Sequence, residues 1–433
     1  MNTPRNSAGF EVRVSRPQRH QAEWLGFTLD ELIRPDDPVR NVWAYVQSMD
    51  LSPFYADIKA VKGGQGRDAV DPAILIALWI FATLEGIGSG RRLARLCERD
   101  VAYMWICGGV GVNRELLNDF RTGYADALDE LFTETIAILL RNDLVSIKRV
   151  SQDGMRVRAS AGKGSFKKKE SLEELLKVAR EQVKQTRADI DDHAAQSKQE
   201  AARARAAKER EARLAKAVEE HKKLAEQRER RKKGDGETTR CSFTDPDARN
   251  MKMADGGFRP ALNLQAATTN DKKIIVAVDV VKDGTDSGQM EPMIAQIIER
   301  TGEQPEEYLV DGGFNSRDDT TNVERKSIKV YAPVRSARKD GTDPHERKIA
   351  DTDEVFAWRQ RMKTDEAKEI YKERGETAEF PNACMRNHGL HQFPVRTLKK
   401  AKTIGLWHAL VHNIQMIITH GWLPVFTEAT EST

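Results

Sequence analysis

Two aspartates have neighbours that suit the binding of a metal ion. Asp153 lies within residues 147–157, which are rich in β-branched side chains, and Gly154 follows it. Asp311 ends the apolar segment 308–310 and precedes two glycines. A strand backbone holds a carboxylate stiffly, and an adjacent glycine lets a ligand approach. Because Mg²⁺ prefers oxygen ligands, such a pair suits metal-assisted phosphodiester chemistry. An Asp that only begins a turn after a strand leaves the same pattern.

The segments around these aspartates alternate between strand and helix patterns. Residues 274–281 form an almost continuous apolar run, which is typical of a strand buried on both faces. The other predicted strands are 147–157, 259–269, 308–310 and 327–332, and the predicted helices are 290–300, 353–387 and 405–418. Strands and helices in this order predict a mixed α/β domain.

The first third of the chain has a helical pattern throughout. Thr28 ahead of Asp30 and Glu31 is a helix N-terminal signature, and Asp71-Pro72 opens a second helix. That second helix is apolar nearly all round, so we expect it in the middle of a helical domain. The sequence predicts a polar arm over 1–25 and an all-α N-terminal domain over 26–143.

A charge-dense segment interrupts the α/β pattern. Residues 170–233 contain neither Gly nor Pro, and apolar residues recur at a spacing of three and four. The positions are Leu172, Leu176, Ala179, Val183, Thr186, Ile190, Leu214, Ala217, His221 and Leu224. One long helix and an antiparallel hairpin turning near 191–200 both fit. We therefore predict a helical, coiled insertion over 170–236, between core segments 144–169 and 237–420, and a tail over 421–433.

Bulk composition points to a globular protein inside the cell. Of the 433 residues, 39% are hydrophobic, and the formal net charge is only +3, so any basic surface must be local. None of the four cysteines forms a C-x-x-C pair, which favours reduced thiols. No secretory signal is visible, and the longest apolar run, 73–83, is shorter than the roughly 20 residues that span a bilayer. We expect a cytoplasmic protein.

Three short segments of the sequence together resemble the catalytic motifs of insertion-sequence DDE transposases. SQDGMRVRASAGKGS, around Asp153, resembles the first motif, and YLVDGGFNS, around Asp311, resembles the second. The third is a helix with Tyr, Arg, Glu and a basic residue at fixed spacing, which is matched here by Tyr371, Arg374, Glu379 and Arg386. Arg386 stands where that Tyr-Arg-Glu-Lys class usually has Lys.

More of the chain agrees, over roughly residues 25–418. One subgroup of this family carries a helical domain ahead of its catalytic core. Four segments here resemble that domain: DPAILIALWI, GIGSGRR, WICGG and DFR. TDPDARNMK resembles the segment after that subgroup's coiled insertion. Further matches are Asn263 and Gln265 on a strand, Asp286 and Gln289 at a helix start, and the His412-Asn413 pair near the end.

The resemblance implies a fold, an activity and partners. The core is expected to be ribonuclease-H-like, a mixed five-stranded sheet flanked by helices, with Asp153 on the first strand, Asp311 after the fourth and Glu379 on a later helix. These three would share two Mg²⁺ ions, for which Mn²⁺ can substitute. The implied reaction is cleavage and strand transfer of double-stranded DNA at terminal inverted repeats and at a target. A homodimer on DNA, nucleoid association and no membrane contact are also implied.

Some residues have more than one interpretation. Tyr371, Arg374 and Arg386 are expected at DNA, and so are Lys163, Lys167 and Lys168, although a solvated loop fits those three lysines equally well. The cluster QRERRKK at 227–233 is either a solvated helix end or a DNA contact. Glu376, and more weakly Glu373, are alternatives to Glu379. Asp245 and Asp247 are interpreted as a turn, and Asp279 as structural.

Three other functions remain open from the sequence, and one of them is a different metal-dependent phosphoesterase. The motif after Glu379 is shifted, because Phe380 follows it directly and Asn382 occupies the place of the usual aromatic residue. This departure suggests, as an alternative, a catalytically inactive transposase-derived DNA-binding protein. The heptad-like segment suggests a coiled-coil scaffold, but that interpretation leaves the two strand-and-glycine motifs unexplained.

Overall fold

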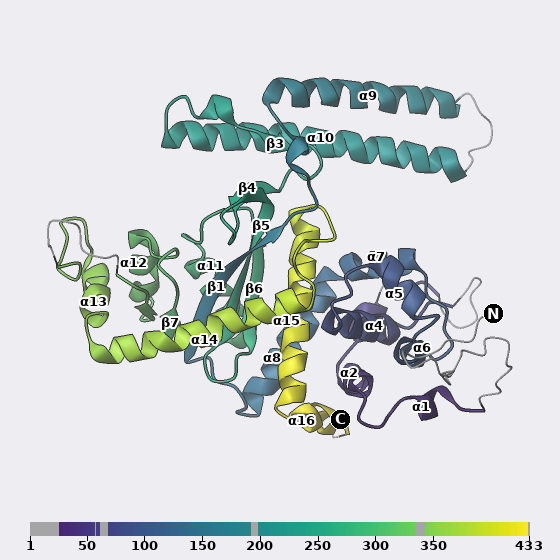
Figure 1. Ribbon diagram of the computed structural model, residues 1–433, viewed down its shortest axis with the longest axis horizontal. Coiled ribbons are helices and arrows are strands. Elements are labelled where there is room, and N and C mark those ends of the chain that lie inside the picture. Colours follow the sequence, from purple (N-terminus) through teal and green to yellow (C-terminus); the bar gives the residue numbers. More distant parts are fainter. Residues whose placement is uncertain (1–25, 57, 61–67, 192–197, 335–342, 432–433) are drawn as a thin grey trace, which may run out of the picture.

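The computed structural model describes residues 26–431 except 57, 61–67, 192–197 and 335–342. The predicted polar arm, 1–25, lies outside the described residues. A helical region, a central sheet and a helical hairpin occupy different parts of the molecule (Figure 1). No helix among the described residues is long and apolar enough to cross a membrane. All four cysteines are free thiols.

The N-terminal region consists of helices packed around α4. Asp71 caps α4 by accepting a hydrogen bond from the backbone N–H of Ala73, and every residue of α4 before Leu84 is buried. The helix N-terminus predicted at Thr28 is present, and Thr28 and Glu31 form a capping box at the start of α1. The helices are α1 (Leu29–Leu32), α2 (Pro38–Gln47), α3 (Ser52–Tyr55), α4 (Pro72–Leu84), α5 (Gly90–Leu96), α6 (Val101–Cys107), α7 (Arg114–Gly123) and α8 (Ala125–Arg141). The central position predicted for α4 is therefore correct.

The sheet is mixed and has six strands. They are β1 (Arg149–Arg158), β4 (Arg249–Lys252), β5 (Phe258–Thr269), β6 (Ile275–Val281), β7 (Glu307–Leu309) and β8 (Lys329–Tyr331). β5 pairs antiparallel with β1, β4 and β6, whereas β1, β7 and β8 run parallel. β4 is an additional edge strand beside the first residues of β5. Without β4, the order β6-β5-β1-β7-β8 is compatible with the predicted mixed five-stranded sheet.

Helices cover both faces of this sheet. α14 (Asp365–Asn387) and α15 (Leu398–Thr419) lie against the face that carries Asp153 and Leu264. α11 (Met290–Thr301) packs against β5 and β6, and Gln289 at its start accepts a hydrogen bond from Gln152 on the opposite face. The remaining helices are α12 (Arg317–Arg325) and α13 (Asp353–Arg361) beside β8, and α16 (Leu423–Glu431) against α2. α15 also contacts α4, α7 and α8, and so joins the sheet to the N-terminal helices.

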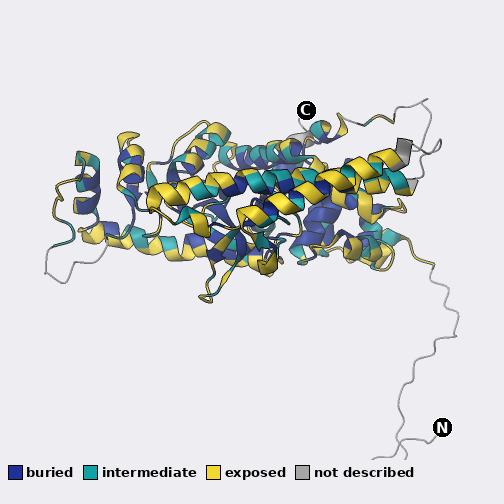
Figure 2. Cartoon of the chain, turned by 90° about the horizontal axis from the view of Figure 1, so that it is seen from above, coloured by how far each residue is buried: buried dark blue, intermediate teal, exposed yellow. Residues whose placement is uncertain are grey.

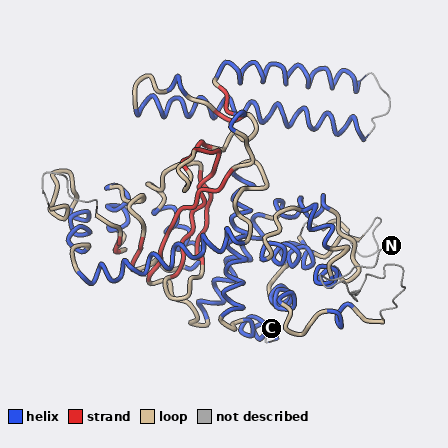
Figure 3. The backbone as a smooth tube through the Cα atoms, viewed as in Figure 1, coloured by secondary structure: helices blue, strands red, loops and turns tan. Residues whose placement is uncertain are grey.

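The charged insertion forms an antiparallel helical hairpin rather than one long helix. α9 (Lys169–Asp191) and α10 (Lys198–Arg231) lie side by side above the sheet (Figures 1 and 3). Leu176, Ala179 and Leu214 are buried between them, as their spacing predicts. Seen from above, the outward surface of the hairpin is largely exposed (Figure 2). At its foot, β2 (Phe166–Lys167) pairs with β3 (Cys241–Ser242), next to the short 3-10 helices η1 (Lys163–Ser165) and η2 (Gly236–Thr238).

Candidate active site

Asp153 lies on β1, and Asp311 lies two residues after the end of the adjacent parallel strand β7. The β1–β7 register pairs Ser151 with Leu309. Two residues beyond this pair, the chain brings Asp311 close enough for its charge to act on the Asp153 carboxylate, although the two are 158 positions apart in the sequence. Both side chains are partly buried. Parallel pairing thus brings together the two carboxylates that their strand contexts predicted.

The surroundings of Asp153 oppose its ionisation. Burial raises the pKa of Asp153 to about 6, the Arg374 guanidinium opposes this rise, and the carboxylates of Asp311 and Asp286 add to it. Arg374 Nη2 donates to one oxygen of Asp153 at 3.1 Å, and Asn382 Nδ2 donates to the other at 2.9 Å. Both oxygens of this carboxylate consequently have a donor from α14.

α14 presents one face to the sheet. Its N-cap Thr364 accepts a hydrogen bond from the backbone N–H of Ala367, and two acidic residues in the first turn suit the helix dipole. Tyr371, Arg374 and Asn382 follow at helical spacing and face Asp153. Burial raises the pKa of Tyr371, and the nearby Arg374 opposes that rise. Tyr371 and Arg374 of the predicted third motif are therefore at the site.

Glu379 lies on the flank of α14 and is exposed. Among the described residues, no group of three or more His, Cys, Asp and Glu side chains is arranged so that it could hold a metal ion. Glu379 is thus not gathered with the two aspartates, and Arg386, seven residues later, is also exposed. Of the two alternatives to Glu379, Glu376 is exposed, and Glu373 forms a 2.6 Å ion pair with Arg149.

Asp286 is a third carboxylate near the aspartate pair, on the face of the sheet opposite to the Asp153 side chain. Its Oδ1 accepts hydrogen bonds from Asn263 at 2.7 Å and from Gln265 at 2.8 Å. A Cβ added to Gly154 would lie 2.2 Å from Oδ1, so glycine is required for this close approach. A Cβ on Gly313 would lie 3.6 Å from Oδ2 of the same residue. The sequence matched Asn263, Gln265 and Asp286 to family motifs but assigned them no role.

Asp311 also makes the turn contact that its position suggested. Its Oδ1 accepts a hydrogen bond from the backbone N–H of Gly313 at 2.7 Å. The turn interpretation and the ligand interpretation are compatible, because one carboxylate oxygen can accept from the backbone while the other stays available. The donor chemistry fits a hard cation, since Mg²⁺ commonly uses one or two carboxylates together with substrate phosphate. Asp153 and Asp311 can supply that pair once a donor from α14 gives way.

The three lysines predicted at DNA lie at the foot of the hairpin. Lys163 is in η1, Lys167 is in β2 and Lys168 immediately precedes α9. All three are exposed, and none forms an ion pair with another described residue. No described acidic residue therefore neutralises their charges.

The turn predicted at Asp245 and Asp247 is present but is not a solvated one. Both residues are buried. Asp247 receives ion pairs from Lys216 at 2.6 Å and from Lys282 at 2.8 Å. Asp279, which was interpreted as structural, pairs with Lys402 of α15 at 2.8 Å. These carboxylates hold elements together, a role that local sequence does not reveal because their partners are distant.

Comparison with known proteins gives one match. Residues 27–122 match the family model described as Transposase domain (DUF772). This segment runs from α1 to α7 and contains none of the candidate site residues. No curated protein and no solved structure matches the chain. The N-terminal helices are therefore similar to a transposase domain, and the match supports a transposase family for the protein.

Proposed function

We propose that the protein is the DNA transposase of an insertion sequence, with a ribonuclease-H-like catalytic core. The observation that carries the proposal is the placement of Asp153 on β1 close to Asp311, which follows the parallel strand β7, in a chain whose N-terminal helices match a transposase domain. The strand order, with three antiparallel strands followed by two parallel ones, supports the same core. The substrates are double-stranded DNA with terminal inverted repeats and a double-stranded target.

Each site residue has a distinct task in this reaction. Asp153 and Asp311 would hold Mg²⁺, and the bound ion would supply activation of the attacking oxygen and neutralisation of charge on the phosphate. Arg374, within reach of Asp153, counters the negative charge of the paired carboxylates until substrate arrives. Asn263 and Gln265 fix Asp286 so that its charge borders the pair.

Glu379 is proposed as the third carboxylate, reached when α14 shifts on binding DNA. Pro381 lies inside α14 and lacks the N–H that would bond the preceding turn, while Gly375 weakens helix propensity on the other side of Glu379. The stretch between Gly375 and Pro381 is therefore the part of the helix that changes conformation at least cost. Exposed Arg386, on the same flank, would hold DNA phosphate.

The helical region 26–143 is proposed to bind the inverted repeat. Arg91, Arg92 and Arg95 give α5 an exposed basic surface, and α15 connects this region to the sheet. Two DNA ends must be processed together, so a homodimer on DNA is part of the proposal. Mass measurement of the DNA complex tests it, and a single chain holding two ends would contradict it.

A second candidate is a transposase-derived protein that binds DNA without cutting it. The observation in its favour is that Arg374 and Asn382 occupy both oxygens of Asp153, while Glu379 stays apart. The two candidates differ in one assay. Labelled duplexes with an intact or a pre-cut inverted-repeat end are incubated with the full chain, with Mg²⁺ and with EDTA. Metal-dependent nicking and strand transfer support the transposase, whereas binding without nicking supports the second candidate.

A further inference from the structure

A large groove of the described structure lies between the helical hairpin and the edge of the sheet. It has a volume of about 1160 Å³ and is bounded by α10, η2, β4 and the loop that follows β6. Nine of its lining residues are Lys or Arg, and only Glu220 and Asp283 are acidic. The lining of the groove is therefore strongly basic, although the net charge of the whole chain is only +3.

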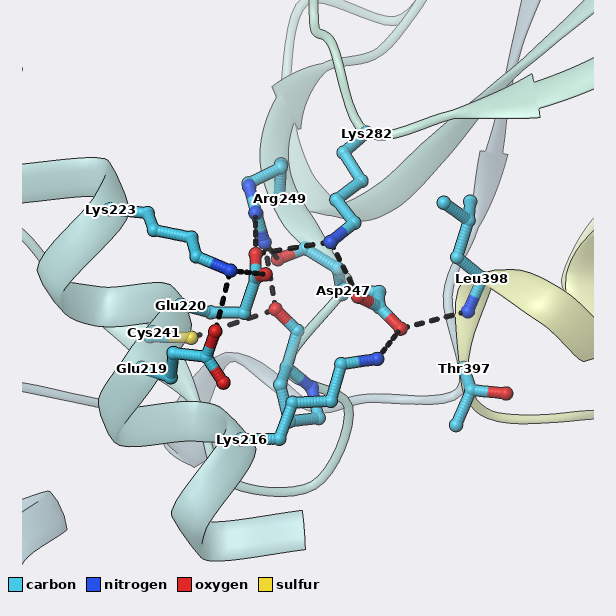
Figure 4. A network of polar contacts seen from close by, with 12 residues as sticks. Lys216, Glu219, Glu220, Lys223, Cys241, Asp247, Arg249, Lys282, Thr397 and Leu398 are labelled. Carbon is cyan, nitrogen blue, oxygen red and sulfur yellow. Dashed lines mark hydrogen bonds and ion pairs between the residues drawn. The ribbon is translucent and has the colours of Figure 1, made fainter. Parts of the chain in front are cut away.

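The acidic residues at the groove floor are already neutralised. Glu220 forms ion pairs with Arg249 at 2.6 Å and with Lys282 at 3.1 Å, and Lys282 also forms an ion pair with Asp247 (Figure 4). Asp247 also accepts a hydrogen bond from the backbone N–H of Leu398, at the start of α15. This network fixes α10 to β4, β6 and α15, so the floor of the groove is held rigidly.

Four other cations of the groove have no acidic partner. Lys163, Arg231, Arg240 and Lys252 line it, are exposed, and form no ion pair with any described residue. They come from η1, the end of α10, the segment before β3 and the end of β4. Because four separate elements contribute them, their convergence is a property of the fold and not of one charged helix. Phe258, 52% exposed, adds an apolar surface beside them.

The groove reaches the candidate active site through one loop. Lys282 to Thr285 line the groove, and the next residue is Asp286. Arg156 spans the junction, because its Nη2 lies 3.0 Å from the carbonyl oxygen of Gly284 and 3.3 Å from the Asp286 carboxylate. A polyanion seated in the groove would therefore lead toward the aspartate pair.

We infer that this groove binds the sugar-phosphate backbone of duplex DNA on one side of the active site, with Lys163, Arg231, Arg240 and Lys252 as the phosphate contacts. The inference rests on the proposed function and adds the place where DNA lies. A row of cations that lack internal partners and surround a rigid floor is the arrangement that phosphate contacts require. Phe258 lies where it would contact sugar carbons.

The test compares two variants of the full chain. The groove variant carries R231A, R240A and K252A, three changes that remove no internal ion pair. The control carries K177A, R187A and K208A, which remove three exposed charges from the hairpin outside the groove. Binding to a labelled duplex is measured by fluorescence anisotropy across salt concentrations, and thermal melting checks that both variants fold.

The salt dependence of DNA binding distinguishes the loss of specific phosphate contacts from a general loss of positive charge. Each lost phosphate contact lowers the slope of log K against log salt by about 0.9. For the groove variant, we expect the slope to fall by the amount that corresponds to two or three phosphate contacts, and the affinity for DNA at low salt to fall at least tenfold. For the control, we expect a slope close to that of the unchanged protein. Equal slopes for the two variants would overturn the inference.

The same titration separates this inference from the proposed function. If the unchanged protein binds duplex DNA and the groove variant binds with the same slope, the groove is not the DNA site, although the transposase proposal stands. If the unchanged protein does not bind duplex DNA, both fail. A groove-dependent slope on duplex RNA with higher affinity than on duplex DNA would overturn the assignment to DNA.

Discussion

Arg374 Nη2 lies 3.1 Å from Oδ1 of Asp153, a contact that joins α14 to β1 across 221 positions of the sequence. Arg374 is the cation that opposes the rise of the Asp153 pKa to about 6. The guanidinium therefore fixes the helix and keeps the carboxylate closer to ionisation. Both effects end if the charge is removed.

We expect R374Q to shift the pH profile of cleavage upward. Asp153 acts as a ligand only when ionised, and loss of the neighbouring cation raises its pKa. Single-turnover cleavage is measured between pH 5 and pH 9. R386Q is the control, because replacing the exposed Arg386 is expected to weaken DNA binding without shifting the pH profile of cleavage. An R374Q profile that coincides with that of the unchanged protein would refute this role.

The close approach of Asp286 to Gly154 predicts that an added methyl group is not tolerated. In G154A the new Cβ would meet Asp286 Oδ1 at 2.2 Å and Gln265 Nε2 at 2.5 Å. We expect a loss of about 1–3 kcal/mol in the free energy of unfolding, together with a loss of cleavage. G375A is the matched control, since nothing lies within 4 Å of its Cβ and it is helical.

Replacing Gly375 should instead stabilise α14 by up to about 1 kcal/mol, because Ala has the higher helix propensity. Chemical denaturation of both variants measures the two effects. If G154A proves as stable as the unchanged protein, Asp286 does not lie where the structure places it.

The sequence predicted the elements of the fold better than it predicted the residues of the candidate site. The run 274–281 and the helix 290–300 were predicted to within a residue or two of β6 and α11, because burial imposes a strong apolar pattern. The helix α12 was missed, because its sequence RDDTTNVER is polar and has no apolar stripe. β4 was missed because a four-residue edge strand has almost no pattern of its own.

The site was predictable only where it depends on local context. Asp153 and Asp311 stood out through the strand before each and the glycine after it. Asp286 did not, because its importance comes from Asn263 and Gln265, which lie more than twenty residues earlier in the chain. The role of Asp247 is likewise invisible without the fold, since Lys216 and Lys282 approach it from different elements.

The buried network below the hairpin predicts a pH-dependent stability. Burial opposes ionisation of Asp247, but Lys216, Lys282 and the backbone N–H of Leu398 more than compensate, and its pKa is about 2 instead of 3.8. The stabilisation is complete above the unfolded-state pKa and is lost as pH falls from about 4 to about 2. At about 1.4 kcal/mol per pKa unit, it amounts to about 2 kcal/mol.

We therefore expect D247N to lower the free energy of unfolding at pH 7, by a difference that shrinks toward pH 2. D255N provides the control, because Asp255 pairs with Arg259 at 2.6 Å on the protein surface, where screening leaves little stabilisation. Denaturant melts at several pH values measure both. A D247N deficit that is independent of pH would argue against an ionised Asp247.

The choice of glutamate on α14 is open to direct test. E379Q is expected to lose at least a hundredfold in the cleavage rate while retaining DNA binding, and E376Q is expected to remain close to the unchanged protein. Both side chains are exposed, so neither change disturbs the core. Loss of cleavage in E376Q with full activity in E379Q would transfer the role to Glu376.

The central claim is that Asp153 on β1 and Asp311, just after β7, carry out metal-dependent cleavage of DNA. Single-turnover nicking of a labelled inverted-repeat end is measured for D153N and D311N with Mg²⁺, at protein concentrations that saturate binding. The account predicts that each variant binds the end as the unchanged protein does and loses at least a thousandfold in the nicking rate. Nicking by either variant at the unchanged rate would contradict it.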